Sequence, residues 1–343
     1  IMEAAAADAA PQPATLQGKV GAFYHAFMDD ARIEALGAQP IAPQLDAVRH
    51  AGTRGQLAAQ MGRTTIDFDG SLFGFYIDAD LKDPKHYAVY IGQAGLGLPD
   101  RDYYLKPAFA KQKAAYRTYV ATLLKLVGWA QPDAAAKDVV AFETAIAQAS
   151  WSKVEQRDPL KAYNPMSVAE LQAFAPGFDW PAYLQAAQLG KLRRVVVAEK
   201  SAFPRIAALY ARTPVATIKA WQATRIADNA AFYLSRPFQD AYFSMHDQTL
   251  TGQKLQLLRW KRAVHAVSGG DCFGERIDRF GNLGWAVGQL YTAQYFPPQA
   301  KAKIEQLVAH LKGAYRSRIQ HLDWMTPATR QEALRKLDTY TIK

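Results

Sequence analysis

Apolar residues recur at helical spacing along most of this chain. After Pro297 and Pro298, a single apolar stripe continues for about six turns. It consists of Ile304, Leu307, Val308, Leu311, Tyr315, Ile319 and Leu322. Steps of three and four residues place these side chains on one side of a helix. The pattern predicts a long amphipathic helix here and, because it recurs elsewhere, a mainly α-helical fold.

Shorter stretches repeat the pattern and carry helix stop signals. Residues 15–36 and 108–127 each run into a glycine, Gly37 and Gly128. Glycine is common just after a helix because it adopts the left-handed backbone conformation without steric cost. Pro132 opens a further periodic stretch, and proline is tolerated in the first helical turn. We therefore expect three helices in these regions.

Helix start signals appear in the middle and at the end of the chain. Ser167 and Glu170 have the spacing of a capping box, in which each side chain binds the other residue's backbone amide. Thr213 and Thr326 each precede a proline. A hydroxyl before a first-turn proline is typical of a helix N-terminus. We expect a helix to begin at each of the three sites.

One region departs from the helical pattern. Residues 72–77 and 87–91 are rich in aromatic and β-branched side chains and predict one small β-hairpin. The acidic connector, residues 78–84, resembles the start of a calcium-binding loop. It lacks the glycine at position six and the glutamate at position twelve of such a loop, so it predicts a simple turn. The expected fold is mainly α, multi-helical, with this hairpin.

The composition favours a globular protein and argues against a nucleic-acid partner. The chain has 343 residues, half of them hydrophobic, and a net charge of +10 from 41 basic and 31 acidic residues. That charge would suit nucleic acid, an anionic surface or an acidic partner. The basic residues near the C-terminus alternate with apolar positions at helical spacing, and no nucleic-acid motif accompanies them. We expect no nucleic-acid partner.

The single cysteine, Cys272, forms no internal disulfide, so the compartment stays open, with a periplasmic or extracytoplasmic location favoured over a cytoplasmic one. No apolar run is long enough to predict a transmembrane segment. The chain begins with Ile1 and stops at Lys343 directly after a helical pattern. We expect it to be a piece of a longer protein.

Histidine pairs offer the first candidate metal sites. His310 and His321 share a helix face but lie roughly 16 Å apart along the axis, too far to bind one ion. His25 and Asp29 have the four-residue spacing of two ligands on a helix, although a surface pair on the polar face is the favoured interpretation. Neither pair predicts a metal site.

Two further constellations also favour structural roles. Cys272 and His265 lack the signature of a catalytic thiol and its base. Gly95 and Gly97 lack the third glycine of a dinucleotide-binding loop. Asp100 and Asp102, which follow in the same loop, have the residue types of an acid and a base. Acidic residues in such a loop more often bind nearby backbone amides, so we expect them to pin the loop.

The loop from Gly95 to Leu105, with its two glycines, a proline, Asp-Arg-Asp and two tyrosines, resembles a segment of the neprilysin, endothelin-converting enzyme and oligopeptidase O family of zinc metallopeptidases. Further segments resemble the same family in the same order: Phe23–Asp29, Glu155–Pro159, Tyr163–Met166, Arg259–Arg262, Gly288–Tyr291 and Asp323–Met325. The resemblance covers almost the whole chain from about residue 19. Residues 269–284 depart from it, because this connection is longer than is usual in the family. The low cysteine content is more similar to bacterial members.

The resemblance implies two mostly helical domains that enclose a cavity, one carrying zinc and the other restricting which oligopeptides enter. This chain resembles the restricting domain. The family's zinc motif, His-Glu-x-x-His, is absent: no histidine of this chain is followed by glutamate. The resemblance therefore implies zinc ligands outside this chain, no catalytic, cofactor-binding or metal-binding residue within it, and no activity of the chain alone. Its expected partners are the C-terminal catalytic half of the same protein and oligopeptide substrates.

We expect residues 1–325 to form the helical domain that caps the substrate cavity, and residues 326–343 to form a helix leading into the catalytic domain. Two alternatives from other classes stay open. The first is a helical binding or scaffold protein that uses this fold without catalysis. The second is a basic nucleic-acid-binding domain, which predicts binding that weakens steeply with salt.

Overall fold

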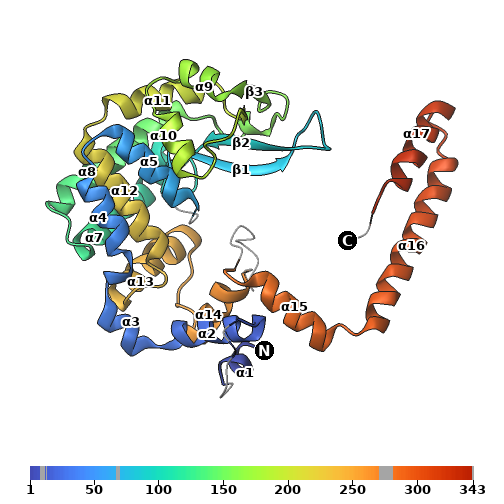
Figure 1. Ribbon diagram of the computed structural model, residues 1–343, viewed down its shortest axis with the longest axis horizontal. Helices are drawn as coiled ribbons and strands as arrows, with labels where there is room; N and C mark the ends of the chain where they lie inside the picture. Colours follow the sequence, from blue (N-terminus) through green and yellow to red (C-terminus); the bar gives the residue numbers. More distant parts are fainter. Residues whose placement is uncertain (8–11, 13, 67–69, 270–280, 342–343) are drawn as a thin grey trace. The chain divides into compact units, whose positions relative to one another are not determined.

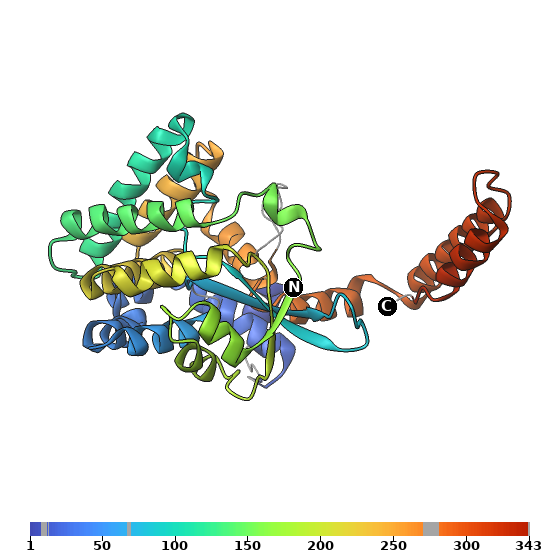
Figure 2. The ribbon, with the colours of Figure 1, turned by 90° about the horizontal axis from the view of Figure 1, so that it is seen from above.

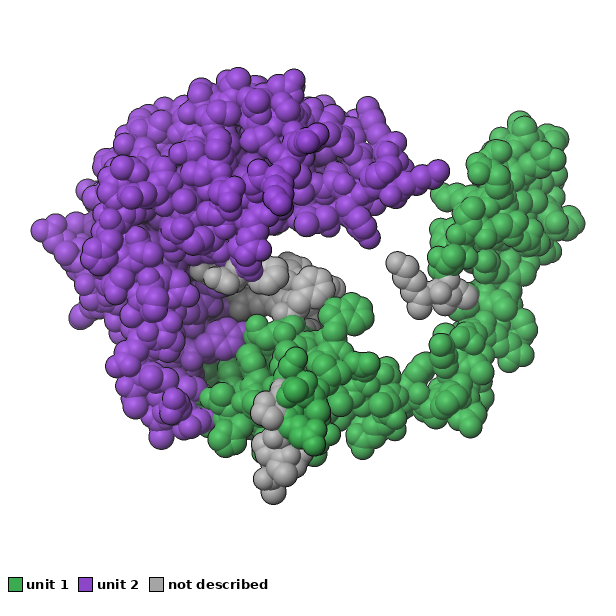
Figure 3. Space-filling view, viewed as in Figure 1, with its two compact units in different colours: residues 1–28, 257–343 green, residues 29–256 purple. Residues whose placement is uncertain are grey.

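The computed structural model confirms a mainly helical protein (Figure 1). It describes residues 1–7, 12, 14–66, 70–269 and 281–341. The described chain separates into two compact units, coloured in Figure 3. Unit 1 consists of Ile1–Met28 and Leu257–Lys343, and unit 2 consists of Asp29–Gln256. No helix among the described residues is both long and apolar enough to cross a bilayer.

The described helices account for most of both units. Unit 2 contains α3 (Asp30–Leu36), α4 (Ala42–His50), α5 (Arg54–Ile66), α6 (Asp102–Leu105), α7 (Ala110–Leu126), α8 (Pro132–Ala149), α9 (Val168–Phe174), α10 (Trp180–Ala186), α11 (Ala202–Arg212), α12 (Val215–Ala230), α13 (Arg236–Tyr242) and the π-helix η4 (Phe243–Thr249). Short 3₁₀ turns occupy Gln39–Ile41, Pro107–Phe109 and Glu155–Arg157. Unit 1 contains α1 (Met2–Ala6), α2 (Leu16–Met28), α14 (Arg259–Ser268), α15 (Gly284–Tyr295), α16 (Pro298–Gln320) and α17 (Pro327–Asp338).

The predicted stop signals and two of the predicted caps are confirmed. Gly37 and Gly128 follow α3 and α7 with φ of 53° and 67°, the left-handed region that favours glycine. Ser167 forms a capping box with Glu170 at the start of α9. The hydroxyl of Thr326 accepts a hydrogen bond from the Thr329 amide at the start of α17.

Two local predictions are wrong. The helix expected over residues 15–36 is two helices, because Asp29 leaves the helical conformation and its carboxylate accepts a hydrogen bond from the Arg32 amide, capping α3. Thr213 precedes α12 but does not cap it. Its hydroxyl donates instead to the Leu209 carbonyl of the preceding helix.

The predicted hairpin is confirmed, and it belongs to a larger sheet. Strands β1 (Phe73–Ala79) and β2 (Tyr87–Gln93) pair antiparallel, and their connector is the predicted turn. Two strands that the sequence pattern did not predict, β3 (Asn164–Ser167) and β4 (Arg194–Val197), complete the order β1-β2-β4-β3. The β2–β4 pair is parallel, whereas the β3–β4 pair is antiparallel.

Asp80 ties the hairpin turn to the far strands of this sheet. Its carboxylate accepts hydrogen bonds from the Tyr163 hydroxyl at 2.6 Å, the Arg194 guanidinium at 2.7 Å and the Lys82 amide at 3.0 Å. The bond from Tyr163 has the largest effect in lowering the pKa of Asp80. Because Tyr163 directly precedes the edge strand β3, Arg194 is the first residue of β4 and Asp80 directly follows the edge strand β1, this one carboxylate joins both edges of the sheet.

An aromatic cluster packs one side of the sheet against the helices of unit 2. The Trp180 ring lies 4.5 Å from the Phe73 ring and stacks on Phe203 at 5.7 Å, measured between ring centroids. The Tyr183 hydroxyl donates to the Phe73 carbonyl at 2.6 Å. All four side chains are buried. This cluster fixes β1 to α10 and α11, and Figure 2 shows α11 running alongside α8.

Removal of the α9 cap tests how much local capping contributes to unit 2. Ser167→Ala is expected to lower the free energy of unfolding by about 1 kcal/mol, because the Glu170 amide loses its acceptor. Urea unfolding of the chain measures the change. Thr118→Ala, which removes a hydroxyl from an exposed site inside α7, serves as the control. Equal unfolding midpoints for the two variants would show that the capping box contributes nothing measurable.

Candidate functional site

Among the described residues, the candidate metal ligands and catalytic residues do not come together as a reactive site. His310 lies inside α16 and His321 lies just after it, where its ring nitrogen contacts the Ser317 carbonyl at 2.7 Å. His25 lies in the last turn of α2. Its expected pairing with Asp29 on one helix is wrong, because α2 ends at Met28 and Asp29 caps the next helix.

The proposed thiol site reaches beyond the described part of the chain. Cys272 lies outside the described residues, whereas His265 lies in the last turn of α14. Over the described residues, no group of three or more histidine, cysteine, aspartate or glutamate side chains is arranged to hold a metal ion.

The loop containing Asp100 and Asp102 is pinned as predicted. Asp100 accepts a hydrogen bond from the Asp102 amide at 2.8 Å and forms an ion pair with Lys153 at 3.0 Å. Asp102 forms an ion pair with Lys106 at 2.7 Å. Asp100 therefore binds a backbone amide and a lysine, and Asp102 binds a lysine, as the predicted pinning of the loop requires.

Gly97 and Tyr104 connect this loop to the interior of unit 2. The amides of Gly97 and Leu98 donate to the Tyr104 hydroxyl at 3.0 and 2.9 Å. That hydroxyl in turn donates to Glu143 at 2.7 Å. A Cβ atom at Gly97 would lie 1.8 Å from the Tyr116 hydroxyl, so only glycine fits. The family-like loop is thus anchored to a buried carboxylate.

Glu143 is the first centre of a buried polar network inside unit 2. It lies on α8 and is fully buried. Its Oε2 accepts the Tyr104 bond. Its Oε1 accepts hydrogen bonds from the Tyr116 hydroxyl at 3.2 Å and the Trp221 indole N–H at 3.1 Å. Three donors from three segments therefore converge on one carboxylate.

Asp228, on α12, is the second centre. Its Oδ1 accepts a hydrogen bond from the Tyr119 hydroxyl at 2.6 Å and lies 2.7 Å from Nε2 of His246. Its Oδ2 pairs with the Arg225 guanidinium at 3.5 Å. Since His246 belongs to the π-helix η4, Asp228 joins that π-helix to α7 and α12.

Burial sets the charge states of the two carboxyls in opposite ways. Burial raises the pKa of Glu143 to about 6, although Arg225 and the three donors act to lower it. Burial also opposes ionisation of Asp228, but His246, Arg225 and Tyr119 outweigh it and hold the pKa of Asp228 well below its usual range. The partly buried guanidinium of Arg225 favours the ionised form of both carboxyls.

This arrangement suits a structural function. Each oxygen of the two carboxylates has a hydrogen-bond or ion-pair partner, and the partners come from α6, α7, α12 and η4. Charge-assisted bonds in a low-dielectric interior hold such elements in one relative position. The network therefore organises the centre of unit 2. It was missed in the sequence because isolated charged residues in a helical pattern ordinarily indicate solvent-facing positions.

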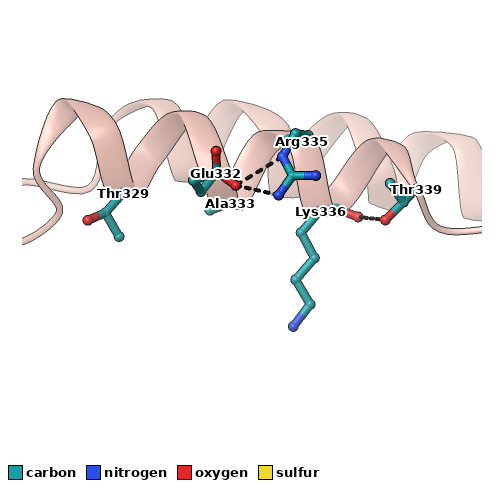
Figure 4. A pocket seen from close by; sticks show the side chains of 6 residues that line it. All are labelled: Thr329, Glu332, Ala333, Arg335, Lys336 and Thr339. Carbon is teal, nitrogen blue, oxygen red and sulfur yellow. Dashed lines mark hydrogen bonds and ion pairs between the residues drawn. The ribbon is translucent and has the colours of Figure 1, made fainter. Parts of the chain in front are cut away.

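Surface depressions lie on α17 and beside the sheet. The first, of about 420 Å³, lies on α17 (Figure 4). It is lined by Thr329, Glu332, Ala333, Arg335, Lys336 and Thr339. All six belong to one helix or its end, and Glu332 already binds Arg335. The second, of about 260 Å³, lies beside β2 and β4, where the Arg194 rim is already bound to Asp80.

Comparisons with known proteins agree over nearly the whole chain. A family model described as "Peptidase family M13" matches residues 1–343. Endothelin-converting enzyme 1 of Rattus norvegicus is 27% identical over 334 residues, which cover 93% of this chain and 42% of that protein.

Solved structures give the same result. The cryo-EM structure of the Mycobacterium tuberculosis zinc metalloprotease Zmp1 in an open state is 35% identical, with a TM-score of 0.86. The match covers 99% of this chain and 51% of that one. The crystal structure of PepO from Lactobacillus rhamnosis, at 22% identity, shares the fold with a TM-score of 0.78. The chain thus spans about half the length of these structures and 42% of that of the curated relative.

Proposed function

Because the chain belongs to peptidase family M13, whose members are zinc-dependent metallopeptidases, we propose that it is the part of a zinc endopeptidase that walls the substrate cavity. In this proposal it limits the oligopeptides that reach the zinc. The observation that carries the proposal is the match over the whole chain together with the absence of His-Glu-x-x-His from its sequence. Zinc bound elsewhere in the protein would supply the Lewis acid for peptide hydrolysis.

The exposed apolar face of α16 supports pairing with a catalytic half. Ile304, Leu307, Leu311 and Tyr315 lie at helical spacing, and 49–59% of the surface of each side chain is exposed. Neither α16 nor α17 contains a buried residue. An amphipathic helix is ordinarily stabilised by covering its apolar side. We propose that the catalytic half of the same protein covers this side, with residues 326–343 leading into that half and residues 1–325 capping the cavity.

The chain's own contribution in this proposal is steric and structural. The buried network centred on Glu143 and Asp228 holds the helices of unit 2 in place, so that the wall keeps its form while peptides enter. Selection then depends on the size and flexibility of the peptide. The chain's residues hold no zinc and transfer no proton in the reaction.

The experiment compares this chain with the protein encoded by the complete gene. We expect the complete protein to bind one zinc ion and to cleave a short fluorogenic peptide, but to leave the same sequence intact within a large folded protein. The chain alone is expected to bind no stoichiometric zinc and to cleave neither. Hydrolysis by the chain alone, or equal cleavage of both substrates by the complete protein, would contradict the proposal. A complete protein without zinc and without activity would instead favour a scaffold.

A further inference from the structure

Strand β1 forms one edge of the sheet in unit 2 (Figure 1). It pairs with β2 along its whole length without a bulge, and no other strand of the described chain lies on its outer side. The outer backbone groups of such a strand are a template for another extended chain. Proteins usually guard an edge with proline, lysine, a bulge or a very short strand. β1 has seven residues in regular register and contains neither proline nor lysine, so this edge is unguarded.

The opposite edge, β3, offers no free backbone donor. Antiparallel strands alternate between residue pairs that exchange backbone hydrogen bonds and pairs that do not. The bond from the Val168 amide to the Arg193 carbonyl continues the β3–β4 register, and it places Pro165 and Ser167 in pairs of the second kind. Their backbone groups therefore face away from β4. Proline has no N–H, and the Ser167 amide donates to Glu170 at 2.7 Å.

The same alternation leaves both donors and acceptors open on β1. The bond from the Asp80 amide to the His86 carbonyl continues the β1–β2 register beyond the strand. Counting back from it in steps of two residues identifies the residues that bond to β2. Phe75 and Ile77 lie between these residues, so their amides and carbonyls face outward. No group among the described residues forms a hydrogen bond with these four outward positions.

Polar contacts mark both ends of the open stretch. The Tyr183 hydroxyl donates to the Phe73 carbonyl, which agrees with an outward direction for that group. At the other end the Tyr90 hydroxyl donates to the Ala79 carbonyl at 3.2 Å, and the Ala79 amide donates to the Asp78 side chain at 2.7 Å. The open edge thus has two residues with unpaired backbone groups between two closed ends, the length that a short extended segment can cover.

Apolar side chains flank the open edge on both faces of the sheet. Ile77 is 60% exposed and lines the depression of about 260 Å³ together with Tyr87 and Val89. Tyr76 is 55% exposed on the other face, where its ring stacks on Tyr90 at 5.0 Å between ring centroids. Successive side chains of an added strand would point to the two faces in turn and would lie against these groups. The surface therefore fits an extended chain that carries apolar side chains.

We propose that the open edge of β1 binds an extended oligopeptide as a fifth strand of the sheet, through the backbone groups of Phe75 and Ile77. A peptide main chain supplies matching donors and acceptors whatever its side chains, and the flanking apolar groups add a preference for apolar residues. The inference rests on the proposed function for its ligand, because oligopeptides are what the chain is proposed to select. A second copy of the chain fits less well, since so short an edge buries less than the roughly 1,000 Å² of a stable interface.

The test measures peptide binding by this chain, whose sequence lacks the zinc motif. The probe is a fluorescein-labelled peptide of alternating valine and threonine residues with a lysine at each end, and fluorescence anisotropy gives its dissociation constant. Ile77→Pro removes the outward amide, and an edge strand tolerates proline on its open side. We expect binding about tenfold weaker, because a hydrogen bond is lost and the proline ring obstructs the peptide. Ile77→Val keeps the amide and the branched side chain and is expected to retain the original affinity.

A second probe makes the test independent of any effect of proline on folding. The same peptide N-methylated at every residue has no backbone donor, so the chain without substitutions is expected to bind it at least about tenfold more weakly. Equal dissociation constants for Ile77→Pro and Ile77→Val, or for the two probes, would overturn the proposal. Absence of saturable binding would do the same, as would a dimer that Ile77→Pro dissociates in analytical ultracentrifugation, because a second copy would then occupy the edge. Since no hydrolysis is measured, failure of this binding is distinguishable from failure of the proposed function.

Discussion

Replacement of Asp228 by alanine is expected to lower the free energy of unfolding by about 3–5 kcal/mol, the usual range when one partner of a buried ion pair is removed. The variant leaves the partly buried guanidinium of Arg225 without its direct counter-ion. It also removes the acceptor of the Tyr119 hydroxyl and one partner of His246. Urea unfolding of the chain, followed by tryptophan fluorescence, measures the loss.

A nearby surface pair provides the matched control. Asp240 pairs with Arg236 at 3.6 Å on α13, and both side chains are largely exposed. Asp240→Ala is therefore expected to change the free energy of unfolding by less than about 1 kcal/mol. Equal losses for Asp228→Ala and Asp240→Ala would contradict a stabilising role for the buried pair.

A double variant separates loss of charge compensation from loss of packing. Asp228→Asn keeps the size of the side chain and one oxygen acceptor, while it removes the charge. Addition of Arg225→Met removes the buried cation as well, so the double variant is expected to recover part of the stability that Asp228→Asn loses. No recovery would show that hydrogen bonds to Tyr119 and His246, and not charge compensation, account for the effect.

Helical periodicity was sufficient to predict most of the fold because the core is built from helices with one apolar side. The stretch opened by Pro132 became α8, and the pattern after Pro298 became α16, close to the expected bounds. Strands β3 and β4 were missed for a physical reason. Each has four residues, too few to establish a period, and β3 contains a proline.

The interior network and the helix break depend on information that sequence spacing does not carry. Glu143 occurs among apolar residues of α8, and Arg225 and Asp228 occur three residues apart on α12. Their partners lie up to 109 residues away in the chain, as for Tyr119 and Asp228. Spacing alone likewise gave no reason to end a helix at Asp29, because the apolar pattern continues through it. Tertiary contacts formed the network, whereas the local cap from the Asp29 carboxylate to the Arg32 amide formed the break.

The apolar stripe of α16 illustrates a different limit. The helix and its stripe were predicted, but the stripe is about half exposed in this chain. An amphipathic pattern specifies that one side is to be covered without specifying what covers it. The covering partner is therefore assigned from family membership and from the length of the relatives, as a proposal.

The pH dependence of stability is expected to show Glu143 directly. In the unfolded chain this carboxyl has a pKa near 4.5, whereas burial raises the pKa in the folded protein to about 6. Between these values the folded state binds more protons than the unfolded state. The free energy of unfolding should therefore fall as the pH rises from 4.5 through 6, by about 2 kcal/mol in total from this group.

Glu143→Gln is expected to remove this decrease, because glutamine keeps the size of the side chain and does not titrate. Urea unfolding at closely spaced pH values measures the slope. Burial also raises the pKa of Glu199, so a smaller slope of the same sign should persist in the variant. Glu155→Gln is the control. Hydrogen bonds from Ser152 lower the pKa of Glu155 in the folded protein, so this carboxyl affects the free energy of unfolding mainly below pH 4.5. The variant should therefore keep the slope between pH 4.5 and 6. If the slope is unchanged in Glu143→Gln, another group binds the additional proton of the folded state. The Glu143 carboxyl would then be ionised throughout this pH range.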